Sequence, residues 1–361
     1  MRKVICYMLL CLAASLAALR AEAQELRIGA DFTTLFDNKE YSSMSYDDSW
    51  TLFSARLTPK VGVAWAERNE LMFAVDMVQD FGSRAKFLSD VNVQLYYGYR
   101  SPRLRLMAGI FPREEMRGLA TPLFFDRDYR YYNNRIAGVL ARYEGKSSER
   151  SFVEFAFDYT GMRNFDTREA FMIMSAGEHA VRGFCFGYDL MVGHYAKDDN
   201  PATDDGVVDN ILATPHVGYD VTAGGFDIAL RLSYVQSLQR DRHFENRWLA
   251  PLGGELYCSI SRWGVTLSNR LYLGDSLLPH YDRYGGELYH GTPFYRTTEG
   301  IYDAITASYG GSFFHDTVAV AAGITMEYDG TGWGTRQWLQ VSVALDYGIS
   351  LERKRKRDIV E

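Results

Sequence analysis

The sequence predicts an all-β fold, a closed antiparallel β-barrel of about sixteen strands that spans a membrane. In short runs from residue 25 to residue 351, apolar residues alternate with polar or small ones. Because a strand sends successive side chains to opposite faces, this alternation predicts a sheet with one apolar and one polar face. The connections between the runs alternate between short and long, which is typical of a barrel with lipid outside and a polar lumen inside.

The first 23 residues have the pattern of a secretory signal peptide. Arg2 and Lys3 precede an apolar stretch at 4–19, and Ala-Glu-Ala at 21–23 fits a cleavage site with small residues. A spanning helix needs about 20 residues, so the stretch is short for one, and an uncleaved anchor is the alternative. We therefore predict a signal peptide at 1–23, a barrel at 24–352 and a basic periplasmic tail at 353–361.

Each strand follows from the alternation in its own run. The predicted strands are 25–37, 50–66, 69–81, 90–100, 103–112, 135–145, 151–161, 168–178, 181–195, 212–223, 225–238, 251–262, 264–276, 300–314, 317–329 and 335–351. The eighth and the tenth are the weakest predictions, the eighth because Phe171, Met172, Ile173 and Met174 are all apolar. Fourteen or eighteen strands are alternatives, and so are a secreted β-sandwich and a β-propeller, although the sequence has no fixed-period repeat.

Charged side chains are predicted on the inner face of the sheet, where they would line the lumen. The candidates are Arg56, Lys60, Asp76, Arg105, Glu154, Asp158, Asp227, Arg231, Arg270, Glu327 and Asp346. The opposite face is almost free of charge, because a charge facing lipid costs up to about 2–4 kcal/mol. Trp65, Trp263 and Trp338 fall near strand ends, at the depth where amphipathic rings settle in a membrane interface.

Composition restricts the partners of the chain. The net charge of −7 argues against nucleic acid, which requires a basic surface. Cys185 and Cys258 fall inside separate strands and form no disulfide framework, so both are interpreted as small apolar fillers. We expect no cofactor and no metal, because the acidic loop 198–209 lacks the ligand spacing of a calcium loop.

The signal peptide, the alternating strands and the order of the loops resemble the porin-like outer-membrane barrels of Gram-negative bacteria. In general porins a long loop after the fifth strand folds into the lumen and narrows it. Here residues 113–134 follow the fifth strand, and the candidate constriction residues are Arg113, Glu114, Glu115, Arg117, Asp126, Arg127, Asp128 and Arg130. Opposed charges at a constriction would select ions by size and sign. The alternative is an external cap whose charges pair in water.

Catalytic motifs are scarce in the sequence, and we expect that the chain is not an enzyme. It has no Gly-x-Ser-x-Gly elbow and no His-x-x-x-His or Cys-x-x-Cys pair. The histidines are scattered, and only His194, near Asp198, is a candidate at the outer rim. His280 and His290 lie in a loop with four tyrosines, which could stack a sugar ring or pack the loop.

The resemblance implies a channel in the outer membrane for passive diffusion of small hydrophilic solutes. Acidic residues outnumber basic ones on the predicted inner face, which favours a mild preference for cations. The expected partners are outer-membrane lipid and these solutes, with a homo-oligomer possible. A closed barrel with a structural or surface-binding role is the alternative, followed by an integral outer-membrane enzyme.

Overall fold

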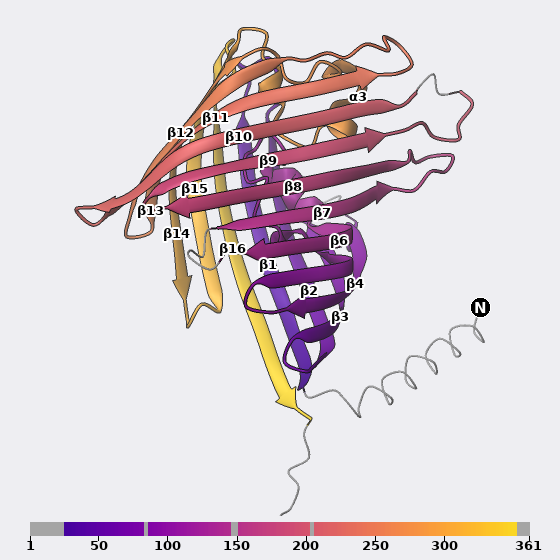
Figure 1. Cartoon of the computed structure of the whole chain (residues 1–361), viewed down its shortest axis with the longest axis vertical. Coiled ribbons are helices and arrows are strands. Elements are labelled where there is room, and N and C mark those ends of the chain that lie inside the picture. Colours follow the sequence, from indigo (N-terminus) through magenta and orange to yellow (C-terminus); the bar gives the residue numbers. More distant parts are fainter. Residues whose placement is uncertain (1–24, 83–85, 146–150, 203–205, 352–361) are drawn as a thin grey trace, which may run out of the picture.

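The computed structural model describes residues 25–82, 86–145, 151–202 and 206–351, which form a closed barrel of sixteen strands (Figure 1). Every strand pairs antiparallel with its neighbours in sequence order. The barrel closes where β1 (Glu25–Glu40) pairs with β16 (Trp333–Ser350), the indigo and yellow ribbons of Figure 1. The predicted fold class is confirmed. The signal peptide and the basic tail lie outside the described residues.

The remaining strands have the predicted order and differ from the predicted bounds by a few residues. They are β2 (Trp50–Trp65), β3 (Asn69–Asp80), β4 (Asp90–Arg100), β5 (Leu104–Pro112), β6 (Arg135–Glu144), β7 (Phe152–Gly161), β8 (Ala170–Val181), β9 (Phe184–Tyr195), β10 (Val208–Ala223), β11 (Phe226–Asp241), β12 (Leu252–Arg262), β13 (Val265–Gly274), β14 (Ile301–Phe313) and β15 (Val318–Tyr328). Both ends of the described barrel chain lie at one end, which we call the periplasmic end; the other end, which carries the short turn 329–332 and all the long connections, is the external end.

Two external connections are much longer than the others and contain the helical segments. Residues 113–134 include η1 (Arg113–Glu115) and α2 (Arg127–Tyr132). Residues 275–300 include α3 (Tyr281–Leu288) and η2 (Pro293–Arg296). No helix in the described ranges is long and apolar enough to cross a membrane.

The outer face of the barrel carries large apolar side chains that no part of the described chain covers. Phe53, Leu95, Phe155, Leu232 and Leu267 are each more than 40% exposed. In a water-soluble protein such side chains would be buried. On the outer face of a membrane barrel they are surrounded by the hydrocarbon of the lipid instead. The predicted lumen-lining residues all lie on the opposite, inner face.

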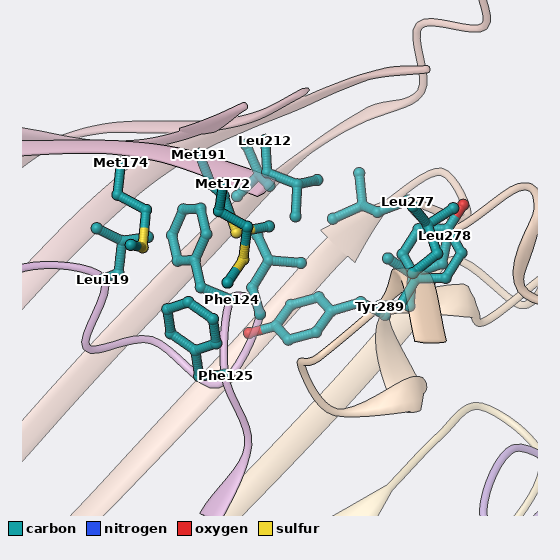
Figure 2. Packing of buried hydrophobic residues seen from close by; sticks show 14 of the residues in the cluster. Leu119, Phe124, Phe125, Met172, Met174, Met191, Leu212, Leu277, Leu278 and Tyr289 are labelled. Atoms are coloured by element: carbon teal, nitrogen blue, oxygen red, sulfur yellow. The ribbon is translucent and has the colours of Figure 1, made fainter. Parts of the chain in front are cut away.

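An apolar cluster fills part of the barrel interior, which the prediction of a polar lumen did not include. Met172, Met174 and Met191 point inward from β8 and β9 and are at most 3% exposed. Figure 2 shows them facing Leu119 and Phe124 of the first long connection. The weak alternation of β8 has its cause here, since lipid lies on one face of the strand and an apolar loop on the other.

We expect that a charge on the outer face destabilises the barrel and that a charge on the inner face does not. Leu232 is 57% exposed on β11, so Leu232→Arg places a guanidinium in hydrocarbon, at a cost of about 2–4 kcal/mol. Ser259→Arg is the control, because Ser259 lines an open inner hollow. Reversible urea unfolding in lipid vesicles measures both, and equal stability of the two variants would contradict the assignment of faces.

Candidate functional site: two loops inside the barrel

The loop 113–134 lies inside the barrel and contacts both sides of its wall. Backbone amides of the loop donate hydrogen bonds to inward carboxylates: those of Arg117 and Gly118 to Glu154 on β7, at 3.0 and 2.6 Å, and that of Leu119 to Asp189 on β9, at 2.7 Å. A hydrogen bond to a charged acceptor is about twice as strong as one between neutral groups. These bonds hold the first half of the loop against the wall.

Gly118 makes this close approach possible. A Cβ atom at this position would overlap Ala176 on β8. A larger residue would push the chain away from the wall and break the neighbouring amide–carboxylate bonds.

Ion pairs with the wall neutralise most charges of the loop. Arg113 lies 2.6 Å from Asp158, and Glu115 lies 2.8 Å from Arg105, which also contacts Glu70 at 2.9 Å. Arg113, Asp158 and Arg105 are buried, so leaving one partner alone would be costly.

The second half of the loop reaches the opposite wall, where β16, β1 and β2 meet. Asp128 pairs with Lys39 at 2.8 Å and with Arg336 at 2.9 Å, and the Tyr131 hydroxyl donates to Ser54. The loop therefore spans the lumen between β7–β9 and β16–β2. Of the two alternatives, the external cap is wrong.

Trp338 belongs to this inner wall, so its predicted place in the membrane interface is wrong. The guanidinium of Arg127 lies 3.8 Å from the centre of its ring, a cation–π contact. Trp338 shares the inward face of β16 with Arg336. Its distance from the strand end does not tell which face it is on; the alternation along the strand does.

A second loop, residues 275–300, also packs inside the barrel, and the sequence did not reveal it. Tyr284 donates to Asp241 on β11 at 2.7 Å, Tyr289 donates to Gln239, and Tyr295 donates to Glu255 on β12. Each tyrosine hydroxyl thus meets a buried polar group of the wall while its ring packs in the apolar cluster. The four tyrosines were the signal that could have identified this loop.

The two inward loops are joined to each other by a contact that we call the latch. The amide of Asp126 donates to the carbonyl of His290 at 2.9 Å, and that of Thr292 to the carbonyl of Pro122 at 2.8 Å. The rings of Phe125, Tyr129 and His290 form a stack, with 4.3 Å between the centres of Tyr129 and His290. Burial and the nearby Arg113 lower the pKa of His290 to about 4, so the ring is neutral at neutral pH.

Four adjoining cavities remain beside the loops, along the wall formed by β12–β16 and β1–β4. The outermost, of about 330 Å³, shares Asp126 with the next, of about 450 Å³. The second cavity shares Glu114 with a third cavity, of about 360 Å³. The third cavity in turn shares Lys60, Tyr96 and Glu115 with a hollow of about 700 Å³ at the periplasmic end. The series leads from the external to the periplasmic end.

Two carboxylates at the junctions of this series, Asp126 and Glu114, make no ion pair with any described residue. The carboxylate of Asp126 caps α2 by accepting from the amide of Tyr129 at 2.7 Å. Burial, and then the neighbouring Asp128, raise the pKa of Asp126 to about 6. Burial, and then Asp31, raise the pKa of Glu114 above its ordinary value.

The predicted lumen-lining residues divide into those near the two loops and those on the far wall. Of the first group, Arg56, Lys60, Arg105, Arg270, Glu327 and Asp346 border the cavity series. Glu154 and Asp158 bond to the loop 113–134, and Asp76 pairs with Arg56. Asp227 and Arg231 lie on the far wall, in a separate hollow near the periplasmic end. The second group therefore has no contact with the two loops and is not part of the site.

The histidine predicted as a catalytic candidate at the outer rim lies elsewhere. His194 stacks on Phe171 at 4.7 Å, and both rings face outward. His179 also faces outward, at the periplasmic end, where its Nδ1 atom lies 3.2 Å from the hydroxyl of Ser151. No motif in the sequence indicates that Ser151 and His179 lie together.

The latch should fail when Gly291 acquires a side chain. A Cβ atom there would overlap the backbone of Leu123 in the other loop, so Gly291→Ala must separate the loops. Losing the hydrogen bonds of the latch should accelerate exchange of the Asp126 and Thr292 amide hydrogens by about tenfold or more. Gly286→Ala is the control, since a Cβ at Gly286 meets nothing. Unchanged exchange in Gly291→Ala would contradict the latch.

Comparison with known proteins gives one family match and several matches of fold. Residues 18–180 match the family model described as lipid A 3'-O-deacylase-type, which is less than half of the chain. No curated protein matches the chain. The expectation that the chain is not an enzyme is contradicted by the family match, because that family is named for an enzymatic activity.

The solved structures similar to this one are outer-membrane barrels. OccAB4 of Acinetobacter baumannii matches with a TM-score of 0.50 and 8% identity, over 91% of this chain and 100% of that one. OccK5 of Pseudomonas aeruginosa matches with a TM-score of 0.50 and 7% identity, over 90% and 98%. A loop deletion mutant of OmpT, an outer-membrane protein of Vibrio cholerae, matches with a TM-score of 0.50 and 10% identity, over 88% and 98%. At such identities the likeness concerns the fold alone, a closed barrel of the kind found in outer-membrane proteins.

Proposed function

We propose that this protein is a narrow channel for passive diffusion of small hydrophilic solutes, with a mild preference for cations. The supporting observation is the series of adjoining cavities from the external to the periplasmic end, with a carboxylate at each of its first two junctions. Sixteen strands enclose an aqueous lumen unless something fills it. Here the two loops fill one side of the lumen and leave the series of cavities along the other.

The preference for cations follows from the charged side chains that border the cavity series and have no ion-pair partner. Arg56, Arg270 and Arg336 border the series, but each is paired with a carboxylate of the wall. The guanidinium of Arg130 donates to the backbone carbonyls of Leu119 and Phe125, so its positive charge has no carboxylate partner. Asp126 and Glu114 contribute two negative charges without ion-pair partners, so the path carries a small negative excess.

The cation preference should depend on pH through Asp126. Its pKa of about 6 means that the carboxylate is charged above pH 6 and neutral below it. The reversal potential in a KCl gradient should therefore show cation preference at pH 8 that declines as the pH falls through 6. Nearby Lys39, Arg130 and Arg336 keep their charge throughout this range.

Asp126→Asn separates this effect from other titrations, since asparagine also caps a helix. We expect a weaker cation preference at pH 8 and a flatter pH profile in this variant. Glu245→Gln is the control, because Glu245 is exposed in an external loop and pairs with Arg247. Folded protein that gives no conductance steps in planar bilayers would exclude the channel.

Hydrolysis of acyl esters is a second candidate, favoured by the match of residues 18–180 to the deacylase-type family. His179 is the only histidine in that segment. Its Nδ1 atom can accept the proton of the Ser151 hydroxyl, as in a nucleophile–base pair. No described carboxylate bonds to His179 to orient it, so the geometry supports the channel better.

Purified protein in vesicles with lipid A or with glycerophospholipid tests this second candidate. If the pair is catalytic, mass spectrometry should detect release of fatty acid that Ser151→Ala reduces by at least about a hundredfold. Ser175→Ala is the control, because the Ser175 hydroxyl also faces outward but bonds to Tyr188 rather than to a histidine. Release that persists in Ser151→Ala would exclude this pair.

A further inference from the structure

We propose that the outermost cavity of the series binds one or two rings of an uncharged saccharide. This inference rests on the proposed function and names the class of solute that the channel receives at its external mouth. The cavity, of about 330 Å³, is near the lower limit for small-molecule sites. Three segments build it: the tops of β1 and β2 with the connection between them, the loop 113–134, and the loop 275–300.

Trp50 provides a flat apolar surface in this cavity. Its side chain is 40% exposed although it stands at the start of β2, where the wall meets the mouth. The ammonium of Lys39 lies over the indole, 4.9 Å from the centre of the ring. The C–H face of a sugar ring packs on such a surface, because an indole offers a large apolar area with a polar edge.

The charges nearest to Trp50 are already paired. Lys39 lies 3.2 Å from Asp47 and 2.8 Å from Asp128, and Arg336 lies 2.9 Å from Asp128. An anionic ligand would have to compete with Asp47 and Asp128 for these cations. An uncharged ligand can occupy the cavity without disturbing them.

Two planar polar side chains remain available for hydrogen bonds to hydroxyl groups. Asn133 is exposed, and its side-chain amide, with one donor and one acceptor end, bonds to no described residue. The carboxylate of Asp126 accepts one hydrogen bond, from Tyr129, and has capacity for more. Neighbouring hydroxyls of a saccharide match such donors and acceptors.

An organic cation fits the same rings less well. Lys39 already lies over Trp50, and Arg296 lies 4.3 Å from the centre of Tyr281. Tyr129 is stacked between Phe125 and His290. A further cation would therefore meet fixed positive charges at two rings and no free face at the third, which removes the cation–π attraction that it needs.

Isothermal titration of the full-length protein in detergent, with glucose, galactose, maltose and lactose as probes, tests the proposal. We expect saturable binding of at least one sugar. Trp50→Leu should weaken it by about tenfold, whereas Trp50→Tyr, which keeps a ring, should retain most of it. Asn133→Ala should weaken binding by about fivefold or more, as expected for loss of a hydrogen bond.

Trp248→Leu is the matched control, because Trp248 lies at the external end outside this cavity, over Arg240, and is 49% exposed. Absence of saturable binding for all four sugars, equal binding by wild type and Trp50→Leu, or tight binding of choline instead would overturn the proposal. Isothermal titration measures sugar binding whether or not the barrel conducts solutes. Sugar binding without conductance would refute the channel alone, and conductance without sugar binding would refute the saccharide site alone.

Discussion

The interior of this barrel depends on carboxylates of its wall that accept hydrogen bonds from the backbone of a loop. Glu154 and Asp189 are inside the barrel, and an isolated carboxylate there would be costly to bury. The amides of Arg117, Gly118 and Leu119 satisfy them. Because these donors belong to the backbone, the arrangement tolerates changes of side chain except at Gly118, where the wall is too close for a Cβ atom.

Once the first loop is held in this way, the rest of the interior follows. Leu119 and Phe124 are brought against the methionines of β8 and β9, and this burial excludes water from that side of the lumen. The second loop adds tyrosines that combine an apolar ring with a hydroxyl, so the apolar cluster can extend to β11 and β12 without leaving wall carboxylates unpaired. The open space is thereby displaced towards β12–β16 and β1–β4, where charged residues of the first loop face it.

The sequence was sufficient for the strands and the order of the loops, whereas the inward position of the loop after β5 was only implied by the resemblance to porins, with an external cap as the alternative. Alternation of side chains is a local property, and a lipid-facing strand must keep it. The second inward loop was missed because alternation tells which face a residue is on but not what covers that face. Inward apolar residues such as Met174 and Leu212 were visible in the pattern, and they indicate that something other than water lies inside.

Other errors have similar causes. Trp338 was placed by its distance from the strand end, although its neighbours on β16 fix it inward. The pairing of Ser151 with His179 depends on the register of β7 and β8, which no motif in the sequence encodes. The absence of familiar catalytic motifs was not sufficient to exclude an enzyme, as the family match demonstrates.

Solvent access to Met174 tests the central claim most directly. Met174 points inward from β8 and is fully buried beneath Leu119. In a variant with Cys185 and Cys258 replaced by serine and Met174 replaced by cysteine, folded into vesicles, a membrane-impermeant maleimide should not label the thiol until the protein is unfolded. Rapid labelling of the folded barrel would show that water fills this side of the lumen, and the account of the two inward loops would be wrong.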